Sequence, residues 1–212
     1  MTKLIYGIGK LTIPPWVLKR VRKISGLENF PKKGGFIIAA NHGSSFDTVV
    51  IPSLFIKMRK PKVHYVAKKE LFEGWFARQF FLGAGCIPVD RKKPGKAAMK
   101  HVLAALKKGE IIGMFPEGTR TRDGKLREAK TGIARLALWS KAPVVPVGLD
   151  DPYKLWPKGR LLPKKGKFDF NIGKPINLEK YYKREESKKL YREITTKIMK
   201  EIAKLCHKRY DY

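Results

Sequence analysis

Short apolar runs alternate along the chain with stretches in which apolar residues recur every three or four positions. The first pattern is typical of buried strands and the second of amphipathic helices. The predicted strands are residues 36–40, 63–67, 87–89, 111–115, 143–148 and 167–173. The predicted helices are a segment that follows Asp47 and residues 68–82, 96–108, 132–140 and 187–206. Repeated alternation of strands and helices predicts a single α/β domain whose largely parallel, mixed sheet is flanked by helices.

Two of the predicted helices carry prominent apolar stripes. The stripe of the last helix is predicted to be buried and consists of Leu190, Ile194, Ile198, Ile202 and Leu205. The helix over 68–82 is dense in aromatic side chains, namely Phe72, Trp75, Phe76, Phe80 and Phe81. We favour core packing for this second stripe. The alternative is an apolar wall for a lipid chain or a membrane contact.

Residues 1–25 mix apolar, aromatic and basic side chains, and Pro14-Pro15 interrupts any continuous helix there. Such a mixture can lie in a membrane interface. A helix docked on the core with a solvated basic face explains the pattern equally well. We therefore divide the chain into a membrane-associating segment, 1–25, and one domain, 26–212. No apolar run reaches 18 residues, so the sequence predicts no membrane span.

The charge of the chain narrows the choice of partners. Among 212 residues, 47 are Lys or Arg and 18 are Asp or Glu, which gives a net charge of +29. A field of that sign attracts nucleic acid, an anionic membrane or a small anionic substrate. The two cysteines form no disulfide framework, and the four scattered histidines lack the spacing of a metal site. We therefore expect no metal.

The first candidate for chemistry is His42, which follows the apolar run at 36–40, with Asp47 five residues further on. A strand, a tight turn and the start of a helix would let the two side chains meet. A carboxylate that accepts a hydrogen bond from one ring nitrogen leaves the other nitrogen free as a base. A histidine that only caps a helix or fills a turn is the alternative for so short a pattern.

Three predicted strand ends carry polar residues, and strand ends of a parallel sheet gather at one edge. They are Asn41-His42, Asp90-Arg91 and residues 116–120. Arg91, Arg120 and Lys130 are cations that can hold a phosphate. Glu117 could hydrogen-bond a hydroxyl or pair with an arginine, and Gly118 would allow close approach of the backbone. These residues together predict a base beside a phosphate-binding pocket.

Four blocks of the chain, in order, resemble motifs of the glycerolipid acyltransferases. The blocks are Asn41-His42-Gly43-Ser44-Ser45-Phe46-Asp47, Gly85-Cys86-Ile87-Pro88-Val89-Asp90-Arg91, Phe115-Pro116-Glu117-Gly118-Thr119-Arg120 and Val144-Val145-Pro146-Val147. Lys130-Thr131-Gly132 also falls where that family often has Lys-x-Gly. The resemblance is strongest to the bacterial enzymes that act on 1-acylglycerol-3-phosphate.

The resemblance implies a reaction and a role for each matching residue. His42 would be the general base and Asp47 its orienting partner, while Ser44 and Ser45 would shape the turn. The acceptor hydroxyl would attack the thioester of acyl-CoA or acyl-carrier protein directly, with no metal or bound cofactor. The residues implied for binding lysophosphatidic acid through its phosphate and glycerol are Arg91, Glu117, Gly118, Thr119 and Arg120, with Lys68 and Lys130 as further candidates.

The resemblance also bears on location and on the alternatives. An enzyme of this kind is expected on the cytoplasmic face of the cell membrane, peripheral or monotopic, against an anionic lipid surface. Within the same chemistry the acceptor could be another lysolipid or glycerol-3-phosphate. A membrane-bound, inactive lipid binder is disfavoured by the intact pair of His42 and Asp47. A basic nucleic-acid-binding protein is the distant alternative, since no zinc spacing, RNP-like motif or compact helix-turn-helix signature is present and no nucleic acid is expected.

Overall fold

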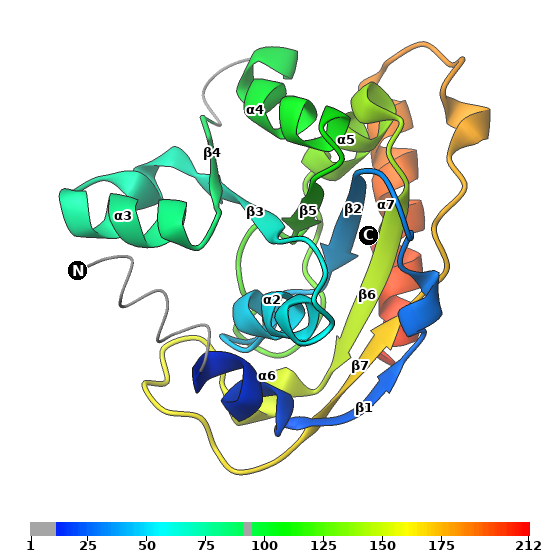
Figure 1. Ribbon diagram of the computed structural model, residues 1–212. Helices are drawn as coiled ribbons and strands as arrows, with labels where there is room; N and C mark the ends of the chain where they lie inside the picture. Colours follow the sequence, from blue (N-terminus) through cyan, green and yellow to red (C-terminus); the bar gives the residue numbers. More distant parts are fainter. Residues whose placement is uncertain (1–11, 91–94) are drawn as a thin grey trace.

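The computed structural model describes residues 12–90 and 95–212. Its centre is a seven-stranded sheet with the order β1-β7-β6-β2-β5-β3-β4 (Figure 1). The strands are β1 (Val21–Ser25), β2 (Phe36–Ala40), β3 (Val63–Lys68), β4 (Ile87–Val89), β5 (Ile111–Met114), β6 (Val144–Asp150) and β7 (Phe168–Ile172). Neighbouring strands run parallel except for β6 and β7, which are antiparallel. The predicted single α/β domain with a largely parallel, mixed sheet is confirmed.

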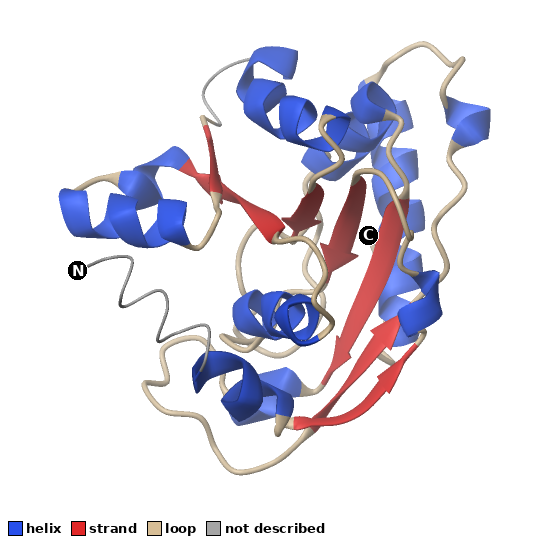
Figure 2. Cartoon of the chain, viewed as in Figure 1, coloured by secondary structure: helices blue, strands red, loops and turns tan. Residues whose placement is uncertain are grey.

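Helices cover both faces of this sheet (Figure 2). One apolar core contains side chains of α4 (Gly95–Lys107), α5 (Gly132–Ser140) and α7 (Lys188–Leu205). The core on the other face contains side chains of α2 (Asp47–Lys57) together with Val17 from the helical residues 12–18. The remaining short elements are η1 (Leu27–Asn29), η2 (Lys69–Phe72), α3 (Trp75–Gly83), α6 (Pro152–Leu155) and η3 (Glu179–Tyr181). In the described part of the chain, no helix has the length and apolar character needed to cross a membrane.

The central strand β2 explains why an uninterrupted apolar run precedes His42. Its side chains alternate between the two faces, so Ile37 and Ala39 join one core while Ile38 and Ala40 join the other. Because helices bury both faces, every position of the strand is apolar. The next two residues therefore emerge at the carboxyl edge in the middle of the sheet.

The sheet starts before the boundary that the sequence predicted after Ser25. Val21–Ser25 form β1, which pairs in parallel with β7, and Val17 in the preceding helix is fully buried. Ile13 and Trp16 of the same helix remain about two-fifths exposed. The described part of this segment thus packs on the domain while presenting two apolar side chains to solvent. The prediction for residues 1–11 lies outside the described residues.

The predicted helix over 68–82 is divided in the structure. β3 continues to Lys68, η2 follows, and Gly74 with φ of 81° separates η2 from α3. No residue of α3 is buried, and Trp75, Phe76 and Phe80 are 60%, 74% and 68% exposed. The preferred prediction of core packing is therefore wrong. α3 extends outward from the end of β3 and packs mainly on η2 (Figure 1). Phe72 and Phe81 of the stripe contact each other and are half-buried, whereas Trp75, Phe76 and Phe80 are exposed.

Candidate active site

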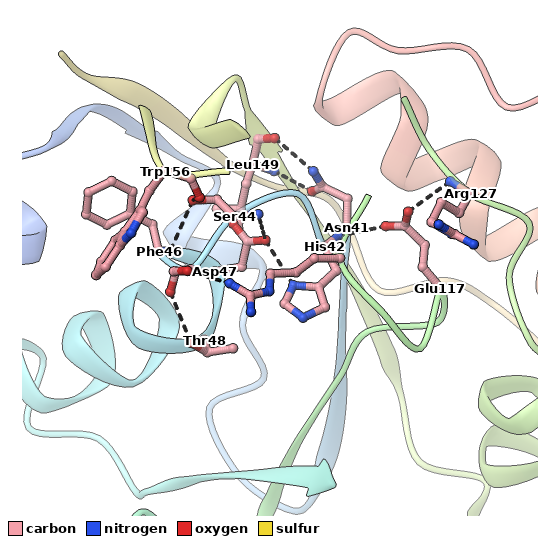
Figure 3. Close-up of polar contacts among 12 residues, drawn as sticks. Asn41, His42, Ser44, Phe46, Asp47, Thr48, Glu117, Arg127, Leu149 and Trp156 are labelled. Atoms are coloured by element: carbon pink, nitrogen blue, oxygen red, sulfur yellow. Dashed lines mark hydrogen bonds and ion pairs between the residues drawn. The ribbon is translucent and has the colours of Figure 1, made fainter. Parts of the chain in front are cut away.

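The candidate site begins where β2 ends, at Asn41 and His42 (Figure 3). The buried Asn41 amide exchanges two hydrogen bonds with the backbone of Leu149 on the neighbouring strand β6. Its Nδ2 donates to the carbonyl oxygen at 3.0 Å, and its Oδ1 accepts from the N–H at 2.7 Å. These two bonds fix the end of β2 against β6, so His42 leaves the sheet in a defined direction.

His42 and Asp47 lie together as the sequence predicted. The ring Nδ1 is 3.1 Å from the carboxylate Oδ2. The Asp47 side chain is fully buried in the first turn of α2, where the positive end of the helix dipole favours a carboxylate, whereas 13% of the His42 side chain is exposed. Among the described residues, the second oxygen of Asp47, Oδ1, has no hydrogen-bond partner. With Nδ1 directed at the carboxylate, Nε2 is the ring nitrogen that can accept a proton.

Two serines hold the turn between His42 and Asp47 in shape. The Ser44 N–H donates to Asp47 Oδ2 at 2.7 Å. The same carboxylate oxygen therefore contacts both the His42 ring and the Ser44 N–H. The Ser44 hydroxyl donates to the carbonyl of Trp156 at 2.9 Å and accepts from the N–H of Phe46 at 3.1 Å. The Ser45 N–H donates to the same Trp156 carbonyl at 3.2 Å. The Ser44 hydroxyl thus serves the turn, which is the role that the family resemblance implied.

Glu117 faces the interior of the protein and is only 3% exposed. Its Oε1 accepts the N–H of His42 at 2.7 Å, and its Oε2 accepts the N–H of Arg127 at 2.8 Å. Burial raises the pKa of Glu117 to about 7, although the two N–H groups act in the opposite direction. The carboxylate therefore links the turn after β2 to the loop after β5. The family resemblance implies that Glu117 binds the substrate; in the structure both of its oxygens accept backbone N–H groups.

Aromatic rings support the imidazole from one side. The His42 ring stacks on Phe115 with 4.0 Å between centroids and 13° between planes, and Phe115 stacks on Tyr65 at 5.2 Å. The Tyr65 hydroxyl donates to the backbone carbonyl of Asp47 at 3.3 Å. Gly113 makes room for this column, because a Cβ there would lie 2.6 Å from the Tyr65 ring. The column therefore fixes one face of the His42 ring.

Two of the predicted cations lie beside this turn and its neighbouring loop. Arg120 Nη1 donates to the Ser45 hydroxyl at 2.5 Å. The guanidinium therefore contacts the turn that follows His42, at a residue three positions after it in the sequence. The aliphatic stem of Lys130 lies over Gly118, where a Cβ would be 3.4 Å from its Cδ and Cε. Gly118 has φ of 70°, a conformation that favours glycine. The loop after β5 thus presents positive charge next to the histidine.

The other predicted binding residues are placed differently. Thr119 is half-buried, and Lys68 is exposed at the end of β3 without a part in the hydrogen bonds of the His42 turn. Arg91 lies outside the described residues. β4, which ends at Val89, is separated from β5 by β3, so this third strand end is further along the sheet than the other two. The neighbouring Asp90 accepts a hydrogen bond from Lys69 Nζ at 2.7 Å.

The described residues contain no cluster of three or more His, Cys, Asp or Glu side chains that could hold a metal ion. Both cysteines are free. Burial raises the pKa of Cys86 to about 11 and that of Cys206 to about 12, so both thiols stay protonated near neutral pH.

Four contributions to the site were not recognised in the sequence. Phe115 belongs to a motif block, but its stacking on His42 has no signal in residue spacing. Tyr65 and the carbonyl of Trp156 come from distant segments, and a carbonyl carries no sequence signal at all. The bridge from Asn41 to Leu149 was detectable only as a polar residue at the end of a buried strand.

The fold and this site define an α/β enzyme with a histidine–carboxylate pair at the end of its central strand. A family model described as "Acyltransferase" matches residues 21–150. The chain belongs to the acyltransferase family.

Named relatives agree with that assignment. The chain is 37% identical over 155 residues to the 1-acyl-sn-glycerol-3-phosphate acyltransferase of Bacillus subtilis, an alignment that covers 73% of each protein. It is 36% identical over 161 residues to the protein of the same name from Limnanthes douglasii, covering 73% of this chain and 54% of that one. The crystal structure of the 1-acyl-sn-glycerophosphate acyltransferase from Thermotoga maritima superposes with a TM-score of 0.67 and 27% identity, covering 96% of this chain and 79% of that one.

Proposed function

We propose that this enzyme transfers a fatty acyl group from an acyl thioester to the free hydroxyl of 1-acylglycerol-3-phosphate and so forms phosphatidic acid. The observation that carries the proposal is the position of Arg120. Its guanidinium contacts Ser45, within the same turn that holds His42 against Asp47. A base and a phosphate-binding cation thus share one short segment, which suits an acceptor that carries a hydroxyl close to a phosphate.

In the proposed mechanism, His42 Nε2 removes the proton of the acceptor hydroxyl as its oxygen attacks the thioester carbonyl. The carbon–sulfur bond then breaks, and the proton on His42 passes to the departing thiolate. Asp47 stabilises the imidazolium that exists between these steps, because its buried carboxylate has no cation other than His42 within hydrogen-bond distance among the described residues.

Arg120 binds the acceptor phosphate in this proposal, and Lys130 adds charge at the edge of the pocket. A guanidinium can grip two phosphate oxygens at once, whereas an ammonium acts as a point charge. Arg91 is assigned to the same phosphate on the family resemblance alone. Glu117 is assigned to positioning, since its two oxygens hold the backbone of His42 and Arg127.

Both acyl-CoA and acyl-carrier protein suit the electrostatics of the donor side. Each donor is an anion, and the chain carries a net charge of +29. Since acceptor and product are lipids, we also propose that the enzyme works on a membrane surface, at the cytoplasmic face. The exposed Ile13 and Trp16 support this placement.

The test is thioester consumption by the purified protein with lysophosphatidic acid as acceptor, with acyl-CoA and acyl-carrier-protein donors tried in turn. The wild type should form phosphatidic acid, and His42→Ala should lower kcat by about 10³-fold, near the middle of the range for a general base. Circular dichroism of the variant checks that it folds. Activity within threefold of the wild type would overturn the base assignment. Turnover only with another lysolipid or with glycerol-3-phosphate would overturn the acceptor and keep the chemistry.

A further inference from the structure

Residues 157–167 join α6 to β7 and lie beyond the part of the chain that the family model matches. The segment contains no acidic residue. Its five cations are all exposed, and they are Lys158, Arg160, Lys164, Lys165 and Lys167. Leu161 and Leu162 at its centre are 87% and 71% exposed, the former being the most exposed large apolar side chain in the described chain. Two exposed leucines between clusters of cations suit a partner that is both apolar and anionic.

Hydrogen bonds give this segment a defined shape. Trp156 Nε1 donates to the Arg160 carbonyl at 2.9 Å, and Arg160 Nε donates to the Leu162 carbonyl at 2.8 Å. The Lys164 N–H donates to the Leu155 carbonyl at 2.8 Å and so closes the segment into a loop. The leucines are therefore held outward on a closed loop, and docking them costs little conformational entropy.

The helical residues 12–18 continue the same surface. Trp16 packs edge-on against Trp156, with 5.9 Å between ring centroids, and Arg20 Nη1 donates to the Lys164 carbonyl at 3.1 Å. We call the combined surface the basic-apolar face. It consists of Ile13, Trp16, Leu161 and Leu162 together with the five cations of the segment 157–167.

The basic-apolar face is tied directly to the catalytic turn. Trp16 also contacts Phe46, the residue before Asp47, at 5.7 Å between ring centroids. The Trp156 carbonyl, where the segment begins, accepts hydrogen bonds from Ser44 and Ser45. Whatever binds this face therefore lies close to the turn that holds His42 and Asp47.

We infer that the basic-apolar face docks on an anionic lipid bilayer, with Leu161 and Leu162 inserted among the acyl chains and the surrounding cations against the headgroups. Side chains of this kind favour such an interface, since leucine gains from leaving water and each cation gains from an anionic surface. A nucleic acid would neutralise the cations but leave both leucines in water. The inference rests on the proposed function, because docking here would deliver lipid substrates from the bilayer to His42.

Sedimentation with vesicles tests this inference without turnover. Phosphatidylcholine vesicles that contain phosphatidylglycerol should bind the wild type, and Leu161→Ser/Leu162→Ser should lower the partition coefficient by about tenfold. Leu27→Ser is the matched control, and it should bind like the wild type. Leu27 is 37% exposed, but it follows the end of β1 at which Ser25 pairs with Asn171, whereas residues 157–167 precede the other end of this strand pair, where Val21 pairs with Phe168. Equal binding by the double variant, or equal loss in the control, would overturn the inference.

A charge-matched pair of variants tests the headgroup contact. Lys158→Gln/Lys164→Gln/Lys165→Gln should weaken binding to anionic vesicles by about tenfold or more and leave binding to pure phosphatidylcholine nearly unchanged. The control Lys183→Gln/Lys188→Gln/Lys189→Gln removes the same charge near the start of α7 and should have little effect. Equal losses of vesicle binding in the two triple variants would show only a general attraction between a basic protein and anionic lipid, and would contradict a docking face. The inference would also be contradicted if the first triple variant lost binding to duplex DNA but kept its binding to vesicles.

Activity separates this inference from the proposed reaction. With a short-chain, water-soluble lysophosphatidic acid the leucine variant should turn over like the wild type, while with acceptor embedded in vesicles its rate should fall in step with its binding. If the wild type shows no turnover with any acceptor, the proposed reaction fails while the vesicle result still stands. If the variant loses activity equally on both acceptors, the segment serves the site itself and the docking role is refuted.

Discussion

The turn after β2 and the loop after β5 come from neighbouring strands, yet they are built in opposite ways. The turn that carries His42 is buried and hydrogen-bonded at nearly every polar atom, from Asn41 through Ser44 to Asp47. The loop that carries Arg120 and Lys130 is less enclosed, because Lys130 is exposed and Arg120 is half-buried. A base must keep one orientation through proton transfer, whereas cations that capture a phosphate must first be reachable by it. One side of the site is therefore fixed and the other accessible.

Glu117 connects the two regions. It leaves from the loop after β5 but places its carboxylate against the backbone of His42 in the turn after β2. The comparison predicts a division of kinetic effects. Changes in the turn should lower kcat, and changes among the cations should raise the KM for the acceptor.

The largest effect after loss of His42 itself is expected at Asp47. A single oxygen of its carboxylate accepts from both His42 and Ser44, so the amide oxygen of Asp47→Asn can keep both contacts while the negative charge is lost. We expect Asp47→Asn to lower kcat by about 10²-fold. Asp47→Ala, which also removes the partner that orients the His42 ring, should lower kcat by several times more, up to about the 10³-fold loss expected for His42→Ala. Steady-state kinetics of both variants measure the two contributions. An Asn variant as active as the wild type would show that orientation alone suffices.

Glu117→Gln tests the link between the two regions. Glutamine has only one acceptor oxygen, so its NH₂ group must face the N–H of either His42 or Arg127. Loss of one of these hydrogen bonds should shift the turn that carries His42, which should lower kcat by about tenfold with little change in the acceptor KM. If the KM rises while kcat holds, Glu117 contacts the substrate, as the sequence first indicated.

The same variant tests the raised pKa of Glu117. The folded protein holds the Glu117 proton up to about pH 7, whereas the unfolded chain releases it near the ordinary value of 4.5. Its contribution to the free energy of unfolding is therefore fully present below pH 4.5 and is lost as the pH rises toward 7, a change on the order of 3 kcal/mol. Urea unfolding at both ends of this window should show a downward slope in the wild type that is smaller in Glu117→Gln. Identical slopes would mean that the pKa is not raised.

The sequence predicted more of the scaffold than of its surroundings, and two helices show why. The stripe of α7 was predicted to be buried. Leu190, Ile194, Ile198 and Ile202 are buried, whereas Leu205 at the end of the helix is half-buried. The stripe of α3 has similar periodicity but is exposed, because spacing shows that a helix is amphipathic and not what covers it. β1 was missed because its side chains Val21 to Ser25 are half exposed at the sheet edge and lack a clean alternation.

The residues of the candidate site also differ in how far local sequence patterns predict them. The pair of His42 and Asp47 was predictable because a strand, a turn and a helix start within seven residues leave little freedom. Arg120 was predictable because β2 and β5 are neighbours and end at one edge. The inward direction of Glu117, the ring of Tyr65 and the carbonyl of Trp156 depend on packing between distant segments, which no local pattern encodes.

Among the cations, Arg120 should have the larger effect. Loss of a charge-assisted, bidentate contact in Arg120→Ala should raise the KM for the acceptor by about tenfold or more, and Arg120→Lys should be intermediate. Ser45→Ala is the matched control, because it removes the hydroxyl that Arg120 contacts while keeping the guanidinium. It should leave KM within about threefold of the wild type. A Ser45 variant as impaired as Arg120→Ala would mean that the arginine acts by bracing the turn.

Lys130→Ala should have the smallest effect, because an exposed ammonium that binds one anion in water contributes at most about 1 kcal/mol. The acceptor KM should rise about threefold at low ionic strength, and salt should erase the difference between variant and wild type. For Arg120→Ala the difference should persist in salt, since a bidentate contact depends on geometry as well as on charge. Acceptor KM measured at low and high salt for both variants distinguishes the two. If the Lys130 variant stays impaired in high salt, its stem over Gly118 shapes the loop, and that part of the accessible side is as fixed as the turn that holds His42.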